Sequence, residues 1–156
     1  MRETPCKADA AAVRELVAST GYFSADETDI AVELVDETLA RGDASGYRFL
    51  FADAPDGSLA GYACFGPIPA TTSSFDLYWI AVSPRVQRQG LGTTLLKESE
   101  SVIRRLGGTR VYIDTSGRAQ YASTRAFYES AGYTVAADLA DFYAPGDAKI
   151  VFCKRL

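Results

Sequence analysis

The stretch LYWIAVSPRVQRQGLGTTLL, residues 77–96, contains a strand, a glycine loop and the start of a helix in one run. Its first six residues are aromatic or aliphatic without interruption, which is typical of a strand in the middle of a sheet. Gly90 and Gly92 follow, and apolar residues recur at helical spacing from Leu91 to Leu106. Because a helix N-terminus presents free N–H groups and a positive dipole, this loop predicts a phosphate-binding site.

Three kinds of glycine loop compete for this pattern. A Walker A loop requires Gly-Lys followed by Ser or Thr, and residues 87–94 contain no such sequence. A dinucleotide fingerprint requires Gly or Ala three residues after Gly92, where the chain has Leu95, and a second nucleotide-binding half is missing. The third possibility is a loop that only packs the helix against the strand, and the two glycines alone do not exclude it.

Outward from this stretch, the hydrophobic pattern predicts alternating helices and strands without a linker or an internal repeat. Two helices come first, at 8–19 and from Ser24 to Gly42, since Ser24 and Glu27 have the spacing of a capping box. The apolar face of the second helix is predicted to be Ile30, Leu34, Val35 and Leu39. The remaining predictions are strands at 47–54, 59–69, 74–84, 110–116, 133–143 and 148–156, and a short helix at 121–131.

This order of elements predicts an α/β fold of the α+β kind, in which a mixed sheet is covered by helices. With 156 residues the chain is long enough for one substantial core, so a single domain over 1–156 is expected. No run approaches the roughly 20 apolar residues of a membrane span, and the first residues lack the pattern of a secretion signal. We therefore expect a cytoplasmic protein without a membrane partner.

Composition excludes several classes of function. The net charge is -4 and the pI about 4.8, whereas nucleic-acid binding needs clustered Lys and Arg, so no nucleic-acid partner is expected. The chain contains no histidine, which excludes Ser-His and Cys-His nucleophile pairs and the His-based zinc enzymes. Cys6, Cys64 and Cys153 are too widely spaced for paired zinc ligands, so we expect reduced thiols and no metal site.

The opening stretch resembles the acyl-coenzyme A binding segment of the GNAT acetyltransferase superfamily. In that family a strand is followed by a loop of the form Gln/Arg-x-x-Gly-x-Gly/Ala, which Gln87, Gly90 and Gly92 match here. A second stretch, YASTRAFYESAGY at 121–133, resembles the family's next motif, a helix that ends in an aromatic-Tyr pair and continues to Gly and an aromatic residue. The two motifs stand at the separation that the family leads us to expect.

The resemblance runs from about Tyr47 to the C-terminus and implies a mixed sheet of six to seven strands, flanked by about four helices. The sheet would splay between the fourth and fifth strands of that fold, which are the strands at 74–84 and 110–116. Acetyl-coenzyme A (acetyl-CoA) would lie in the opening. The residues implied for it are Ile80, Ala81, Val82, Gln87, Arg88, Gln89, Gly90, Leu91, Gly92, Thr93, Tyr121 and Thr124. Tyr121 stands where the second motif often has Asn.

The implied reaction is transfer of an acetyl group to an amine, which needs a base for the amine and an acid for the departing thiolate. Tyr128 would be the acid, because a phenol with a pKa of about 10 can donate to sulfur and the family places this Tyr beside it. Asp76 matches a general-base position in the family, and Asp114 would lie across the splay from it. Each carboxylate could instead bind the cationic substrate or be solvated.

Acceptor selection is expected at the front of the site, where aromatic residues would form walls for an amine or belong to the core: Tyr22, Phe23, Tyr78, Phe142 and Tyr143. Acidic residues of the second helix would attract a cation or form a solvated face. We therefore expect an N-acetyltransferase that acts on a small-molecule or peptide amine, as a monomer or a homodimer. The alternative is a sensor that binds acyl-CoA without turnover.

Overall fold

The computed structural model describes residues 1–156, and its elements follow the predicted order. The helices are α1 (Lys7–Ser19), α2 (Ala25–Arg41), α3 (Leu91–Arg105) and α4 (Ala122–Ser130), with short 3-10 turns η1 (Gly42–Ser45), η2 (Pro84–Val86) and η3 (Ala119–Tyr121). The strands are β1 (Arg48–Asp53), β2 (Leu59–Pro67), β3 (Ser74–Val82), β4 (Arg110–Ser116), β5 (Thr134–Ala144) and β6 (Asp147–Arg155). Every predicted helix and strand is confirmed, with ends that differ by at most two residues.

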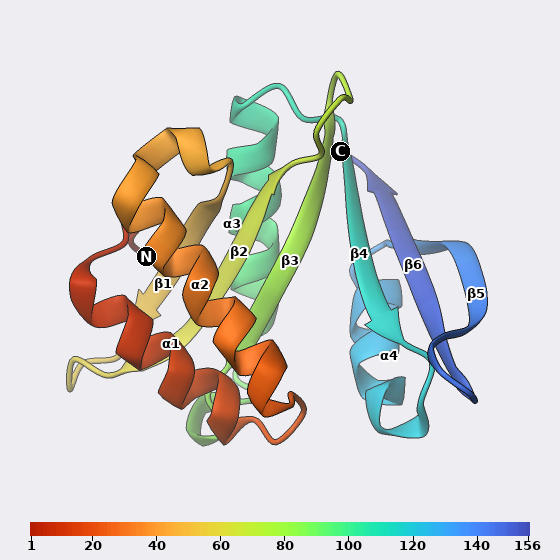
Figure 1. Cartoon of the computed structure of the whole chain (residues 1–156), viewed down its shortest axis with the longest axis horizontal. Coiled ribbons are helices and arrows are strands. Elements are labelled where there is room, and N and C mark those ends of the chain that lie inside the picture. The colour runs from red at the N-terminus through yellow and green to blue at the C-terminus, as the bar shows by residue number, and fades with distance from the viewer.

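The six strands form one sheet in the order β1-β2-β3-β4-β6-β5. β3 and β4 run parallel and all other neighbours are antiparallel, so the sheet is mixed as predicted. Figure 1 shows α1 and α2 in front of β1–β3, α3 behind these strands, and α4 behind β4 and β6. None of the helices has the length and apolar character that a membrane crossing requires.

The sheet splays between β3 and β4, the two strands that the family resemblance indicated. They pair only at Ser74–Asp76 and Arg110–Tyr112, and below this point Figure 1 shows them moving apart. Tyr78 is an extra residue on β3, because its neighbours Leu77 and Trp79 pair with consecutive residues of β2. Such a bulge bends a strand and increases its twist, which turns the lower part of β3 away from β4.

Each face of the sheet carries its own core. α3 and α4 cover a cluster that includes Phe65 and Phe152, neither of which is exposed to solvent. α1 and α2 cover a second cluster that includes Val17 and Phe51, which are equally buried. Side chains along a strand alternate between the two faces, so this division fixes on which side of the sheet each residue of β3 and β4 lies.

The predicted apolar face of α2 is wrong for Ile30 and Leu39, which are 46% and 38% exposed. The buried face is formed by Thr28, Ala31, Val32, Val35 and Thr38. Both threonine hydroxyls donate to carbonyls of the preceding helical turn, each at 2.9 Å. Because these hydroxyls find partners within the helix, two polar residues can lie on the face that packs against the protein.

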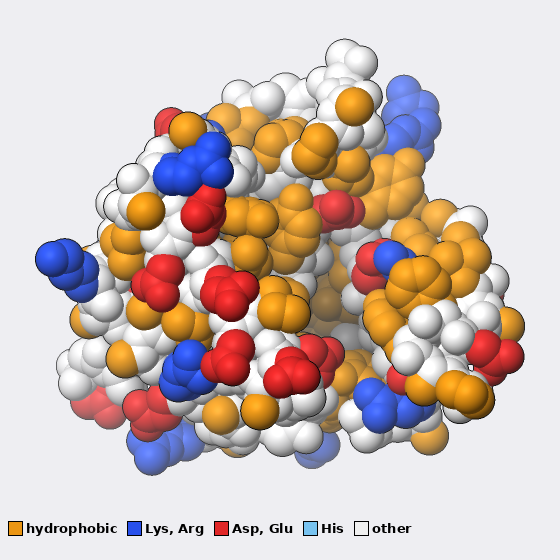
Figure 2. Space-filling model, in the orientation of Figure 1, with side chains coloured by type: hydrophobic (Ala, Val, Ile, Leu, Met, Phe, Trp, Pro, Cys, Tyr) orange, Lys and Arg blue, Asp and Glu red, His pale blue; other side chains and the backbone are white.

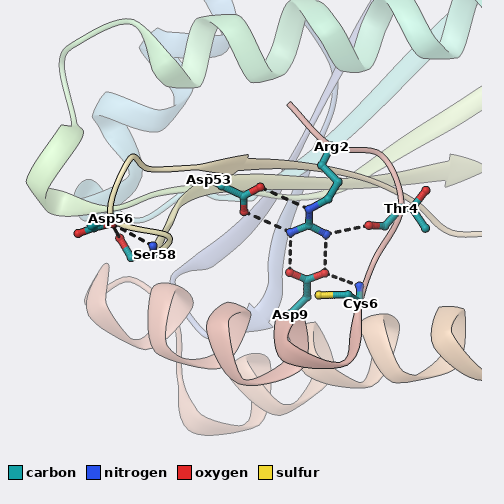
Figure 3. A network of polar contacts seen from close by, with 7 residues as sticks. All are labelled: Arg2, Thr4, Cys6, Asp9, Asp53, Asp56 and Ser58. Atoms are coloured by element: carbon teal, nitrogen blue, oxygen red, sulfur yellow. Dashed lines mark hydrogen bonds and ion pairs between the residues drawn. The ribbon is translucent and has the colours of Figure 1, made fainter.

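The N-terminal segment is held to the sheet and to α1 by Arg2 (Figure 3). Its guanidinium donates to the two carboxylate oxygens of Asp9 at 2.7 and 2.8 Å, to Asp53 at the end of β1, and to the carbonyl of Thr4. It also lies 4.6 Å from the centre of the Phe51 ring. Asp9 is only 3% exposed, so its charge is removed from water but paired in a bidentate arrangement.

Candidate active site

The splay opens into a cleft of about 880 Å³ that is lined from both sides. One wall consists of β3, the loop before α3 and the loop between α1 and α2; the other consists of β4, η3, α4 and the β5–β6 hairpin. Figure 2 shows the cleft as a hollow between the two halves of the molecule, with apolar and acidic side chains around it. The cleft is lined by Asp76, Asp114 and Tyr128, and by Phe23, Tyr78 and Tyr143. The structure thus brings together all the residues predicted for catalysis and for the acceptor.

The loop before α3 presents unpaired N–H groups to this cleft. Arg88 and Gly90 both have left-handed backbones, with φ of 62° and 85°, so the chain turns sharply here. The first amide of α3 that donates a helical hydrogen bond is that of Thr94, which donates to the Gly90 carbonyl at 3.0 Å. The N–H groups of residues 91–93 precede it and have no protein partner. Together with the positive end of the helix dipole, they form a concavity that suits an anion.

The loop also leaves room for a phosphate. A Cβ added to Gly90 would meet no atom within 4 Å, and one added to Gly92 would meet only Phe127 and Val82, at 3.7 Å. The side-chain amide of Gln87 donates to the Val82 carbonyl at 3.2 Å and so ties the loop to the end of β3. The residues present therefore fit the pyrophosphate of coenzyme A.

Most residues predicted to hold acetyl-CoA line the cleft: Ile80, Ala81, Val82, Gln87, Arg88, Gly90, Gly92, Thr93, Tyr121 and Thr124. Gln89 and Leu91 do not line it. Gln89 is exposed, and Leu91 packs into the core beside Gly61 of β2. The predicted contacts of these two residues with the cofactor use their backbone N–H groups and stay predictions.

The lower part of β3 offers a free edge to the cleft. Beyond Asp76 no strand pairs with β3 on the side of β4. Of the carbonyls in this segment, that of Val82 already accepts from Gln87. An extended chain that enters the splay can therefore hydrogen-bond to the remaining backbone groups in the manner of an added strand.

Tyr128 lies on α4 with its ring in the core beneath the sheet. The ring centre is 5.3 Å from that of Phe127, 5.7 Å from that of Phe152 and 6.0 Å from that of Tyr133. Only 4% of the residue is exposed, yet it lines the cleft and its hydroxyl makes no hydrogen bond. Burial raises the pKa of Tyr128 above its usual value. The phenol therefore keeps its proton at neutral pH, which is the form that a proton donor needs.

Asp76 lies where β3 and β4 part, and its carboxylate has no ionic or hydrogen-bonding partner in the protein. Burial and the negative charge of Asp114 raise the pKa of Asp76 to about 6, although Lys149 opposes them. Asp114 is itself paired with the ammonium of Lys149. A carboxylate with this pKa accepts a proton near neutral pH, which favours Asp76 over Asp114 as the base.

Tyr128 and Asp76 belong to opposite faces of the sheet. Leu77 and Ile113 point into the cluster under α3 and α4, which also contains Tyr128. Asp76 and Asp114 are their sequence neighbours on β3 and β4, so they point to the face under α1 and α2. A reacting group can touch both Tyr128 and Asp76 only inside the gap between the strands.

Aromatic side chains gather on the α1 and α2 face of the cleft. Phe23, from the α1–α2 loop, stacks on Trp79 with ring centres 5.7 Å apart and planes 25° apart. Tyr78, the bulge residue, packs edge-on against Tyr47 at 5.5 Å. Tyr143, from the β5–β6 hairpin, is 49% exposed. Such surfaces suit the ammonium group and the apolar body of an amine alike.

Tyr22 and Glu27, which were predicted on the acceptor side, line the cleft, whereas Phe142 does not. The sequence-based predictions missed four other cleft residues: Trp79, Thr115, Arg118 and Asp147. The indole Nε1 of Trp79 and the hydroxyl of Thr115 are buried without a hydrogen-bond partner. Trp79 gives no signal in the sequence, because the bulge at Tyr78 changes which side of the sheet the following residues face. Asp147 follows the turn sequence APG, where a carboxylate usually serves the turn itself.

Tyr121 has an additional contact that the second motif does not indicate. Its hydroxyl donates to the main-chain carbonyl of Tyr22 at 2.9 Å, across the cleft. The residue is 8% exposed, and its pKa is raised by burial and by the negative charge of Glu27. It therefore touches the α1–α2 loop as well as the cleft.

Residues 11–133 match the family model for the acetyltransferase (GNAT) family. A crystal structure described as a GNAT-family acetyltransferase from Desulfovibrio desulfuricans is 49% identical to this chain, with a TM-score of 0.96. The similarity covers 99% of this chain and 96% of that one. A search of curated proteins gave no match.

More distant solved structures share the fold. An aminoglycoside 6'-N-acetyltransferase in complex with coenzyme A is 16% identical, with a TM-score of 0.75 over 99% of this chain and 97% of that one. A protein from Salmonella typhimurium, described as an acetyltransferase with acetyl-CoA, is 23% identical, with a TM-score of 0.74 over 100% and 95%. These likenesses confirm the predicted architecture, a mixed sheet of six to seven strands flanked by about four helices, and this chain has six strands and four helices.

Proposed function

The chain belongs to the GNAT acetyltransferase family, and from this premise we propose that it transfers an acetyl group from acetyl-CoA to a primary amine of a small molecule or peptide. One observation carries the proposal: three kinds of unpaired polar group line a single cleft. They are the N–H groups of Gly92 and Thr93, the hydroxyl of Tyr128 and the carboxylate of Asp76. Their tasks would be to hold the phosphates, to protonate the departing thiolate and to accept the amine proton.

Acetyl-CoA would bind from the side of the glycine loop. Its pyrophosphate would accept from the N–H groups of residues 91–93, and its pantetheine arm would extend along the free edge of β3, near Ile80. This path leads the thioester into the gap between β3 and β4, beside Tyr128. Arg88 lines the same part of the cleft and would add a positive charge near the phosphates.

The amine would approach from the α1 and α2 face, where Asp76 lies. Its nitrogen would attack the thioester carbonyl carbon, and the carbon–sulfur bond would then break. Tyr128 would give its hydroxyl proton to the departing thiolate, and Asp76 would take a proton from the amine, directly or through one water. The products are an N-acetyl amide and coenzyme A, and solvent then restores the protonation states of both side chains.

Asp114 would act on Asp76 and not on the substrate. Its carboxylate is paired with Lys149, but its charge helps to raise the pKa of Asp76 toward the pH at which a general base works well. Tyr78 and Phe23 support the choice of an amine acceptor, since their rings line the face of the cleft from which the amine would approach.

The test is an acetyl-CoA turnover assay with a panel of primary amines, combined with a direct binding measurement. We expect thiol release with at least one amine, and an N-acetyl product in equal amount by mass spectrometry. A protein that binds coenzyme A but releases no thiol with any amine of a broad panel would be a sensor and would contradict the proposed function.

A further inference from the structure

The α1–α2 loop reaches the far wall of the cleft and is held there by one hydrogen bond. The hydroxyl of Tyr121 in η3 donates to the main-chain carbonyl of Tyr22 at 2.9 Å, between residues 99 positions apart in the chain. The two rings lie 5.7 Å apart and are inclined by 58°. Figure 1 shows this loop and the start of α4 at the lower end of the sheet, where β3 and β4 are apart.

Tyr121 is the fixed side of this bond. Its ring contacts that of Tyr22, and the guanidinium of Arg118 is 5.6 Å from the ring centre. Arg118 is held in turn by the carboxylate of Asp147 at 3.0 Å and by the hydroxyl of Ser116 at 3.2 Å. These contacts all come from the wall formed by β4, η3 and the β5–β6 hairpin, so the bond fastens the loop to that wall.

The loop also carries an aromatic residue that packs on β3, the strand of Asp76. The residue after Tyr22 is Phe23, and its ring stacks on Trp79 of β3 at 5.7 Å. Trp79 and Asp76 are both on the part of β3 that lines the cleft. When the loop is fastened at Tyr121, the aromatic pair of Phe23 and Trp79 therefore borders the place where an amine would meet the thioester.

We propose that Tyr121 is a specificity-determining residue, which holds the α1–α2 loop across the acceptor side of the cleft and so favours compact primary amines over extended ones. The residue acts through the loop and does not touch the reacting atoms, so its role is one of positioning. The statement about amines rests on the proposed function, whereas the statement about the loop does not.

The loop can be followed without any turnover, because Trp79 is the only tryptophan of the chain. The variant Tyr121→Phe removes the donor and keeps the ring. Since a single hydrogen bond shifts an equilibrium by roughly fivefold, we expect acrylamide to quench Trp79 about twofold more strongly and the amides of 22–24 to exchange faster. Tyr22→Phe is the matched control, because Tyr22 contributes its main-chain carbonyl and the bond survives.

The effect on specificity is measured with n-butylamine as the compact acceptor and trialanine as the extended one. In Tyr121→Phe we expect the ratio of kcat/KM for trialanine to that for n-butylamine to rise roughly fivefold. The far-UV circular dichroism spectrum of Tyr121→Phe should match the parental one, which a general loss of structure would not allow.

Two results would overturn the inference. Quenching of Trp79 that is the same in Tyr121→Phe, Tyr22→Phe and the parent would show that the bond does not hold the loop. A raised KM for acetyl-CoA with an unchanged ratio between the amines would show that Tyr121 serves the co-substrate. If the parent acetylates no amine while quenching responds as expected, the proposed function fails and the fastening of the loop stands.

Discussion

Asp9 and Asp76 are two aspartates that the fold takes partly out of water, and they differ in what surrounds them. Asp9 accepts two hydrogen bonds from Arg2 and one from the N–H of Cys6 at 2.6 Å (Figure 3). Burial alone would raise the pKa of Asp9, but these bonds outweigh it and hold the pKa below its usual value. Asp76 has no such partner, so burial, together with the charge of Asp114, raises its pKa to about 6.

This difference separates two uses of polar groups in one molecule. Around Arg2 the charges are paired, and the pairing fastens the N-terminal segment to the sheet. Around the cleft the amides of 91–93, the hydroxyl of Tyr128 and the carboxylate of Asp76 lack protein partners, which lowers stability unless a ligand completes them. We therefore expect substitutions near Arg2 to change stability, and substitutions in the cleft to change binding and turnover.

The largest expected effect is the loss of turnover in Tyr128→Phe. Without the proton donor, kcat should fall by about 100-fold or more, while the free energy of unfolding changes little because the hydroxyl has no partner. Tyr133→Phe is the matched control, since the Tyr133 hydroxyl donates to Glu100 at 3.1 Å. Tyr133→Phe should lower the free energy of unfolding by about 1 kcal/mol and leave kcat within a few-fold of the parental value. Thiol release and chemical denaturation measure the two quantities, and a parental kcat in Tyr128→Phe would remove the acid role.

The next effect concerns the phosphate loop. Gly90→Val places a side chain where the pyrophosphate would approach, so the affinity for coenzyme A should fall at least about tenfold by titration calorimetry. Gly57→Val is the matched control, because Gly57 also has a left-handed backbone with free space around it but lies in the β1–β2 turn. Both variants should lose comparable stability from backbone strain, about 1–2 kcal/mol. Equal affinities in the two variants would place the phosphates elsewhere.

A smaller effect is expected for Asp9→Asn, on stability alone. A lowered pKa in the folded state means that the Asp9 carboxylate stabilises the fold above its usual pKa and loses this contribution as the pH falls through and below it. The variant should therefore be less stable than the parent by about 1–2 kcal/mol at pH 7, and the difference should shrink below about pH 4. Urea denaturation at both pH values tests this. A changed affinity for coenzyme A would contradict the separation of the two regions.

The smallest effect on stability has the opposite sign and is expected for Asp76→Asn. A raised pKa in the folded state means that the Asp76 contribution is complete below the usual pKa and is lost as the pH rises through about 6. The variant carries no charge at this position, so its melting temperature should exceed the parental one at pH 7.5 and match it near pH 4. Thermal denaturation at both pH values measures this difference. A melting temperature below the parental one at pH 7.5 would show that the carboxylate has a stabilising partner.

The features that could be predicted from the sequence are local in the chain. The spacing of Gln87, Gly90 and Gly92 fixes the loop before α3, and the aromatic pair ending at Tyr128 lies within one helical segment. The bond between Tyr121 and Tyr22 joins positions 99 residues apart, so no spacing rule could indicate it. The same holds for the pairing of Arg2 with Asp53 at the end of β1, which depends on how the N-terminal segment lies against the sheet.

Other failures have a different physical cause. The buried face of α2 includes Thr28 and Thr38, which look like solvent-exposed positions until their hydroxyls are seen to bond within the helix. The side of the sheet on which Trp79 lies depends on the bulge at Tyr78, and a single extra residue reverses the alternation of a strand. In the first case a local hydrogen bond of a side chain, and in the second an extra residue in a strand, overrides the hydrophobic pattern.

The short pairing of β3 with β4 has a consequence for how such a protein can diverge. Because the opening results from backbone hydrogen bonds that are never formed beyond Asp76, no side chain is needed to create it. Positions such as Phe23 and Tyr143 can therefore be exchanged through evolution without closing the cleft or moving Tyr128. Under the proposed function, the scaffold can acquire new acceptors by point substitution at the rim of the cleft, while the glycine loop and Tyr128 stay in place.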